Sequence, residues 1–192
     1  MKIGLFFGSF NPVHVGHMII ANFMAEHTSL NKVWMVVSPQ NPHKKRATLA
    51  KDYDRLHLVN LAIGDNPKIQ SSNIEFSLPK PSYTVDTLSY LKEKYTDHEF
   101  VLIMGGDNLA TFHKWKNYEE ILKHHEIFVY KRPSYELGEL QNHEKVSIFE
   151  APLMQISSSY IRKRIKESAS IKYLVVDAVE EHIASSGMYK SL

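Results

Sequence analysis

The sequence predicts an α/β fold in which helices cover both faces of a doubly wound parallel sheet, giving three α/β/α layers. Continuous apolar runs at 2–7, 32–38 and 99–104 are typical of strands that are buried on both faces. Helical patterns lie between such runs, and strand–helix–strand units place their strands in parallel. With 192 residues, we expect one domain over 1–192, whose C-terminal part at about 157–192 is helical.

The composition excludes several classes of function. The chain has no cysteine, which rules out disulfides, thiolate metal sites and cysteine nucleophiles. A formal net charge of +2 is too small to indicate a nucleic-acid surface. The N-terminus leads directly into the first apolar run, and no run reaches the roughly 18 residues of a membrane span. We therefore expect a cytoplasmic protein without nucleic-acid or membrane partners.

The stretch from Gly8 to His17 joins the first strand to a helix that starts near Val15. His14 and His17 then lie on one side of the first helical turn, with Cβ atoms roughly 5–6 Å apart. Unsatisfied N–H groups and the helix dipole favour phosphate at this point. Two imidazoles can stabilise the charge that develops in phosphoryl or nucleotidyl transfer. Metal ligation and incidental turn residues are the alternatives, although no third ligand lies nearby in the sequence.

A basic loop over 39–49 follows the second strand and carries His43, Lys44, Lys45 and Arg46. It leaves the carboxyl end of a strand, where open α/β sheets bind ligands, but a solvated basic loop fits equally well. The next helix covers 52–63 and ends at Gly64. We expect Arg55 to face water and an apolar stripe to face the core. The stripe comprises Tyr53, Leu56, Val59, Leu61 and Ile63.

The middle of the chain has weaker patterns. Residues 68–78 predict one or two short strands. Pro81 fixes a turn, and Ser82 or Thr84 caps a helix that runs through Leu88 and Leu91.

The run at 99–104 leads into Gly105 and Gly106, where the backbone can approach a ligand closely. Asp107 can accept hydrogen bonds from ribose hydroxyls, and Trp115 offers a flat face to a pyridine ring. A helix cap at Asp107 and a core position for Trp115 are the alternatives.

The last third predicts a short helix at 117–123 and strands at 125–130 and 146–149. A helix then starts near Ile156. Hydroxyls of Ser157 and Ser159, together with Arg162 one turn later, form a cradle for a polyphosphate. Serine capping followed by a solvated basic face explains the same residues. A closing amphipathic helix over 172–185 packs against the domain through Tyr173, Leu174, Val176 and Val179.

Four segments resemble known signatures. Gly-Ser-Phe-Asn-Pro-Val-His-Val-Gly-His at 8–17 resembles that of the H-x-G-H nucleotidyltransferases, which implies a Rossmann-like fold. Residues 156–162 resemble their second signature, Ile-Ser-x-Thr-x-x-Arg, with Ser159 in place of threonine. Residues 81–88 and 105–115 resemble the bacterial nicotinate mononucleotide adenylyltransferases. Asn11 departs from the pattern, because many relatives have an aspartate and its negative charge there.

This resemblance implies a site for two nucleotides. His14, His17 and Arg162 are the implied catalytic residues, with His17 near the α-phosphate of ATP and Arg162 at the departing phosphates. The implied ATP-binding residues are Gly8, Ser9, Phe10, His14, Gly16, His17, Gly105, Asp107, Ile156, Ser157, Ser159 and Arg162. The implied mononucleotide-binding residues are Ser9, Phe10, His43, Lys44, Tyr83, Thr84, Val85, Asp107 and Trp115.

The implied reaction joins ATP and nicotinate mononucleotide to give nicotinate adenine dinucleotide and pyrophosphate, a step in NAD biosynthesis. The implied cofactor is Mg²⁺ that bridges substrate phosphates without ligands from protein side chains. Transfer to nicotinamide mononucleotide or to phosphopantetheine is an alternative, as is a non-catalytic nucleotide sensor. The sequence leaves open the choice between the acid and the amide, and whether the chain forms homo-oligomers.

Overall fold

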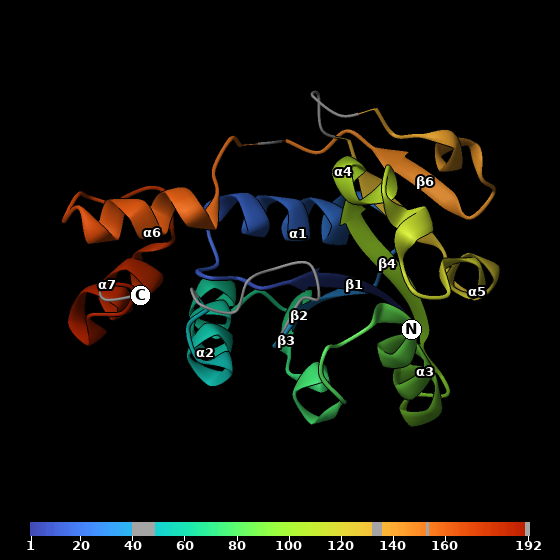
Figure 1. Ribbon diagram of the computed structural model, residues 1–192, viewed down its shortest axis with the longest axis horizontal. Coiled ribbons are helices and arrows are strands. Elements are labelled where there is room, and N and C mark those ends of the chain that lie inside the picture. The colour runs from blue at the N-terminus through green and yellow to red at the C-terminus, as the bar shows by residue number, and fades with distance from the viewer. Residues whose placement is uncertain (40–48, 132–135, 153, 191–192) are drawn as a thin grey trace.

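The computed structural model describes residues 1–39, 49–131, 136–152 and 154–190, and its centre is a parallel sheet (Figure 1). Within the described residues, the sheet is 6-stranded with the order β3-β2-β1-β4-β5-β6, and every neighbouring pair is parallel. The strands are β1 (Lys2–Gly8), β2 (Lys32–Val37), β3 (Ile69–Ser72), β4 (Glu99–Gly105), β5 (Ile127–Tyr130) and β6 (Val146–Phe149). The predicted doubly wound parallel sheet is confirmed.

Helices cover both faces of this sheet, so the three predicted layers are present. One hydrophobic core lies between the sheet and α1, α2, α6 and α7. The other lies between the sheet and α3, α4 and α5. The helices are α1 (Val15–His27), α2 (Asp52–Ile63), α3 (Thr84–Lys94), α4 (Gly106–Leu109), α5 (Tyr118–His124), α6 (Ser158–Lys166) and α7 (Asp177–Ser186). Short 3₁₀ helices are η2 (Ile74–Ser77), η3 (Phe112–Lys114) and η4 (Glu139–Asn142).

The strand order reverses between β1 and β4. The chain moves outward from β1 to β2 and β3, then returns to place β4 on the other side of β1. Phe6 pairs with Ile103 in this register, so both strands end on glycines, Gly8 and Gly105, at the same edge. In open α/β sheets, ligands bind beyond the carboxyl ends of the strands at such a switch point.

The second helix has the predicted bounds, and the predicted core stripe is correct except at Tyr53: Val59 is buried, and Leu56, Leu61 and Ile63 pack against the core. Tyr53 is 69% exposed, and Leu58 is fully buried in its place. Residues 68–78, predicted to form one or two short strands, contain one strand, β3, followed by the 3₁₀ helix η2. The helix after Pro81 begins at Thr84, with Tyr83 as its N-cap and without a side-chain capping bond, so the predicted serine or threonine cap is wrong.

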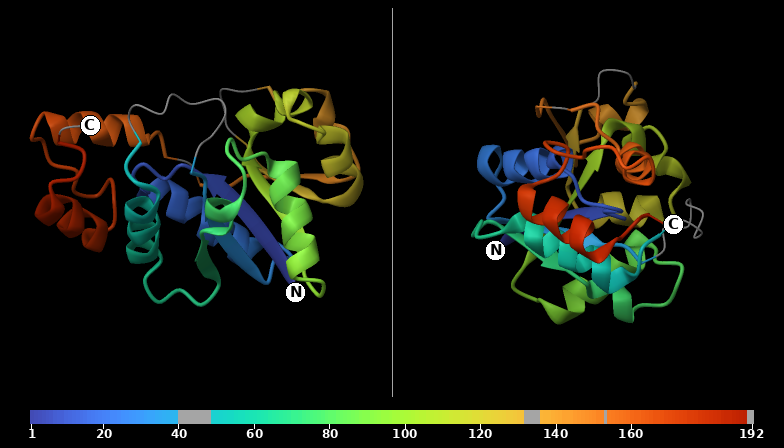
Figure 2. Two further views of the ribbon diagram at one scale, coloured as in Figure 1. Left: turned by 60° about the horizontal axis from the view of Figure 1, so that its bottom comes forward. Right: turned by 90° about the vertical axis from the view of Figure 1, so that its left-hand side faces the viewer.

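The C-terminal part lies at the end of the molecule opposite β6, where α6 and α7 stand together (Figure 2). The predicted helix over 172–185 begins later, at Asp177. Lys172 and Val175 form an isolated bridge, and Tyr173, which was predicted to pack inward, is 83% exposed. Within the described residues, we find no helix long and apolar enough to cross a membrane.

Candidate active site

The two histidines of the first turn lie in contact at the switch point. Their rings stack with centroids 3.7 Å apart and planes 24° apart. α1 begins at Val15, directly after His14, and His17 is its third residue, so the predicted helix start is confirmed. The ring of His14 is buried and that of His17 is half-buried.

A main-chain bond fixes the protonation pattern of His17. The His14 N–H donates to Nδ1 of His17 at 3.2 Å, so Nδ1 acts as an acceptor. A neutral imidazole that accepts at one nitrogen carries its proton on the other. Nε2 of His17 is therefore the donor, as a contact with a phosphate oxygen requires.

The N–H groups of the first turn are less available than the sequence indicates. The N–H groups of His17 and Met18 both donate to the His14 carbonyl, at 2.9 and 3.3 Å. The Val15 N–H donates to the Leu174 carbonyl at 3.0 Å. Because the N–H groups of Val15, His17 and Met18 are engaged, an anion at this turn would meet side chains more than these three N–H groups.

Phe10 backs the histidines from the core side. It is only 2% exposed and meets His17 edge to face, with ring centroids 5.0 Å apart. A Cβ atom at Gly8 would lie 2.6 Å from the Phe10 ring, so this close approach requires glycine. The Phe10 side chain therefore faces the core, and only its main chain remains for the predicted substrate contacts.

Gly16, the glycine of H-x-G-H, makes room for the first histidine. A Cβ atom here would lie 3.1 Å from Nδ1 of His14 and 3.2 Å from its Cε1. These distances are shorter than ordinary van der Waals contacts, so any larger residue would displace the His14 ring.

The N-terminal end of α6 docks directly on the first turn. Arg162 donates from Nη1 to the Asn11 carbonyl at 2.7 Å and from Nη2 to Ser159 Oγ at 3.3 Å. Ser157 caps the helix by accepting from the Tyr160 N–H at 3.2 Å. Ser158, which lies outside the residues that the sequence patterns indicated, donates to the Pro12 carbonyl at 2.9 Å. The two signatures, 146 residues apart at this bond, thus form one surface.

Asn11 has a structural role. It is buried, and its Oδ1 accepts from the Ala50 N–H at 3.1 Å while its carbonyl holds Arg162. A neutral amide meets this requirement without the negative charge of an aspartate.

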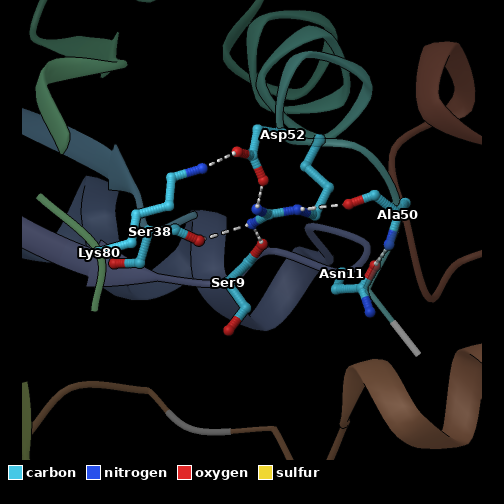
Figure 3. Close-up of polar contacts among 7 residues, drawn as sticks. Ser9, Asn11, Ser38, Ala50, Asp52 and Lys80 are labelled. Carbon is cyan, nitrogen blue, oxygen red and sulfur yellow. Dashed lines mark hydrogen bonds and ion pairs between the residues drawn. The ribbon is translucent and has the colours of Figure 1, made fainter. Parts of the chain in front are cut away.

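Arg55 does not face water, so that prediction is wrong. Its side chain is fully buried and donates to the carbonyls of Ser9, Ser38 and Ala50 and to the Asp52 carboxylate (Figure 3). The spacing of Arg55, Leu58 and Val59 puts all three on one helical face, which is a sequence signal for its burial.

The segments predicted to bind the second substrate also lie together. Lys116 lies over the Tyr83 ring, with Nζ 4.6 Å from its centroid, and pairs with Asp86 at 3.0 Å.

Trp115 is half-buried against Phe112, with centroids 5.1 Å apart, so it is neither a full core residue nor a free ring. Thr84 and Val85 begin α3. Asp107 lies in the first turn of α4, directly beyond Gly105 and Gly106.

The sequence patterns also did not indicate the buried carboxyl group of Glu75, which contacts Thr87 of α3. Glu75 is 2% exposed and accepts from Thr87 Oγ1 at 2.9 Å. Burial raises the pKa of Glu75, while hydrogen bonds from the Ser38 and Thr87 hydroxyls act in the opposite direction.

His43 and Lys44, with Lys45 and Arg46, lie outside the described residues. Among the residues that the structure does describe, no group of three or more His, Cys, Asp or Glu side chains could hold a metal ion.

Comparison with known proteins agrees with this geometry. Residues 5–164 match the family described as Cytidylyltransferase-like. The chain is 56% identical over 191 residues to a probable nicotinate-nucleotide adenylyltransferase of Cytophaga hutchinsonii, covering 100% of both chains. It is 54% identical to the protein of that name in Flavobacterium psychrophilum, covering 99% of this chain and 100% of the relative.

A solved structure shares the fold. Nicotinic acid mononucleotide adenylyltransferase of Plasmodium falciparum, complexed with NaAD, superposes with a TM-score of 0.83 at 20% identity. The match covers 98% of this chain and 97% of that one.

A Rossmann-like sheet with H-x-G-H at its switch point, met by a serine- and arginine-bearing helix, defines a nucleotidyltransferase of the cytidylyltransferase-like type. Within that class, the chain belongs to the nicotinate-nucleotide adenylyltransferase family.

Proposed function

We propose that the protein transfers the adenylyl group of ATP to nicotinate mononucleotide, giving nicotinate adenine dinucleotide and pyrophosphate in NAD biosynthesis. The observation that carries this proposal is the 2.7 Å bond from Arg162 to the Asn11 carbonyl, because it joins both signatures at the switch point. Full-length identity to relatives named for this activity supports the choice of substrate.

In this reaction, the phosphate of the mononucleotide is the nucleophile. One of its oxygens forms a bond to the α-phosphorus of ATP, and the bond from that phosphorus to the bridging oxygen of pyrophosphate breaks. The attacking phosphate is ionised at neutral pH, so the protein does not need a base to activate it. Catalysis then depends on positioning and on charge stabilisation.

The side chains have distinct proposed roles on the ATP side. His17 donates from Nε2 to the α-phosphate, and His14 stacks on it and contacts the same triphosphate. Arg162, Ser157 and Ser159 hold the phosphates that leave. Main-chain atoms contribute the remaining contacts, at Gly8, Ser9, Phe10, Gly16, Gly105 and Ile156, with Asp107 at the ribose.

For the mononucleotide, we propose that Tyr83, Thr84 and Val85 contact the pyridine nucleotide and that Trp115 stacks on its ring. The Lys116 contacts with Tyr83 and Asp86 support this assignment, because they join the two segments. Asp107, Ser9 and Phe10 complete the proposed set.

ATP enters as its Mg²⁺ complex in this proposal, with the ion held by substrate oxygens and water. The described donors around the triphosphate site are imidazole, hydroxyl and guanidinium groups, which suit phosphate oxygens rather than Mg²⁺. Bound Mg²⁺ would neutralise charge on the departing pyrophosphate. We also propose that 1–192 act as one nucleotidyltransferase domain, since α6 and α7 share a core with α1 and α2.

A pyrophosphate-release assay tests the function. Purified protein is given MgATP with nicotinate mononucleotide, nicotinamide mononucleotide or phosphopantetheine in parallel. We expect the highest kcat/KM with nicotinate mononucleotide. Higher kcat/KM with the amide or with phosphopantetheine would replace the proposed substrate, and no release with any of them would favour a nucleotide sensor.

A further inference from the structure

A buried arginine outside the proposed set of substrate contacts connects the parts of the candidate site. Nε of Arg55 donates to the Ala50 carbonyl at 3.1 Å, and Nη2 donates to Asp52 Oδ1 at 2.8 Å. Nη1 donates both to the Ser38 carbonyl, at 3.0 Å, and to the Ser9 carbonyl. Ser9 lies in the turn between β1 and α1, Ser38 directly follows β2, and Ala50 and Asp52 lie at the start of α2 (Figure 3).

The energetics of burial make this arrangement rigid. A fully buried guanidinium is tolerated only where hydrogen bonds and a counter-charge replace its hydration. Arg55 is 0% exposed, and Asp52 supplies the carboxylate that faces it. Displacing any one acceptor would leave part of a buried charge unsatisfied, so the three carbonyls are held in one relative position.

The network leads from Arg55 to the proposed catalytic arginine. Asn11 lies two residues after Ser9, and its Oδ1 accepts from the Ala50 N–H at 3.1 Å. The main chain of the first turn is thus held at Ser9 by the guanidinium and at Asn11 through Ala50. The Asn11 carbonyl is the acceptor for Arg162. A shift of Arg55 would therefore move the atom on which Arg162 is anchored.

The same carboxylate extends toward the segment of the second substrate. Lys80 Nζ lies 3.1 Å from Asp52 Oδ2, while Oδ1 of that carboxylate binds Arg55. Lys80 precedes Tyr83 by three residues. Asp52 thus contacts Arg55, which holds the turn between β1 and α1, and Lys80, which lies shortly before the start of α3.

We propose that Arg55 is a positioning residue for adenylyl transfer, which sets the main chain of Ser9 to Asn11 and through it the position of Arg162. This inference rests on the proposed function. Arg55 does not touch the reacting atoms in this role. It acts through a carbonyl that must be correctly placed for Arg162 to meet the departing phosphates.

The test is Arg55→Lys, which keeps the charge but cannot reach three carbonyls and a carboxylate together. Arg164→Lys is the matched control, because Arg164 also donates to a carbonyl, that of Ser170 at 2.8 Å, outside this network. We measure kcat and KM for both substrates, the Kd of MgATP by calorimetry, and Tm.

We expect kcat of Arg55→Lys to fall by about 10- to 100-fold at 20 °C, because misplacement of about 1 Å at a distance from the chemistry has effects of this size. KM for the mononucleotide should rise by a smaller factor than kcat falls, because Ser9 and Phe10 offer this substrate only part of its proposed contacts, whereas Arg162 acts on the departing phosphates. Arg164→Lys should keep its kcat within about twofold of wild type. A lower Tm with wild-type kcat in folded Arg55→Lys would make Arg55 a purely structural residue and overturn the proposal.

A second variant and a binding measurement test the proposal if Arg55→Lys does not fold or if the wild type shows no turnover. If Arg55→Lys does not fold at 20 °C, Asp52→Asn replaces it, and we expect kcat to fall by about 3- to 10-fold because the guanidinium loses its counter-charge. Wild-type kcat there overturns the proposal. If the wild type turns over no mononucleotide, the proposed function fails separately. In that case, the Kd of MgATP tests the positioning role of Arg55. We expect Arg55→Lys to bind MgATP about tenfold more weakly, and an unchanged Kd would overturn this role.

Discussion

Arg162 donates a 2.7 Å hydrogen bond from Nη1 to the main-chain carbonyl of Asn11, so the second signature is anchored on the first. Its other terminal nitrogen contacts Ser159 Oγ at 3.3 Å. The planar guanidinium is thereby oriented by two neutral acceptors, the Asn11 carbonyl and the Ser159 hydroxyl. An arginine held in this way is prepared to bind an anion.

Arg162→Lys tests this orientation. An ammonium group cannot bond both acceptors in the same plane, so the charge remains but its placement is lost. We expect kcat to fall by about 10²- to 10³-fold, the range seen when one donor to transition-state charge is removed. Pyrophosphate release measures it, and Arg164→Lys is the control. A wild-type kcat would restrict Arg162 to a structural role.

His17→Ala should lower kcat by about 10²- to 10³-fold through loss of the Nε2–H donor. Because the ring also packs edge to face against Phe10 and Phe6, we expect the free energy of unfolding to fall by about 1 kcal/mol, which lowers Tm by about 2–4 °C. His27→Ala, at the exposed end of the same helix, is the matched control. Wild-type turnover in folded His17→Ala would contradict the assignment.

Trp115→Ala should chiefly raise KM for the mononucleotide, by about tenfold, because stacking on an aromatic ring is worth about 1–3 kcal/mol. Trp115→Phe keeps a flat ring and should raise KM less. Steady-state kinetics with saturating MgATP separate KM from kcat. If KM is unchanged in Trp115→Ala while Tm falls, Trp115 serves only the core around Phe112.

Local patterns in the sequence predicted the sheet and the first signature well. The central strands β2, β1, β4 and β5 follow apolar runs, and a strand buried on both faces needs no more distant information. The helix bounds at Asp52 and Ile63 were also correct, since Gly64 ends the helix with a φ of 58°.

The misses concern contacts between distant segments. Arg55 appears solvated by residue type, and its acceptors at Ser9 and Ser38 meet it only after folding. Leu174 to Val179 have a helical apolar pattern, but the Leu174 carbonyl instead accepts from Val15, and α7 starts at Asp177. In both cases, a main-chain atom between β1 and the start of α1 forms a hydrogen bond with a residue far away in the sequence, and the local pattern does not predict that contact.

Glu75→Gln tests the buried carboxyl behind α3. Because burial raises the pKa of Glu75 above its ordinary value of 4.5, the folded protein retains this proton at pH values where the unfolded chain has lost it. The wild type therefore loses stability as the pH rises from 4.5 through the raised pKa, whereas glutamine does not titrate. We expect Tm of Glu75→Gln, relative to wild type, to increase between pH 5 and pH 8. Differential scanning calorimetry across this range measures the difference, with the exposed Glu93→Gln on α3 as the matched control. A pH-independent difference for Glu75→Gln would show that the carboxyl ionises equally in both states, in spite of its burial beside Thr87.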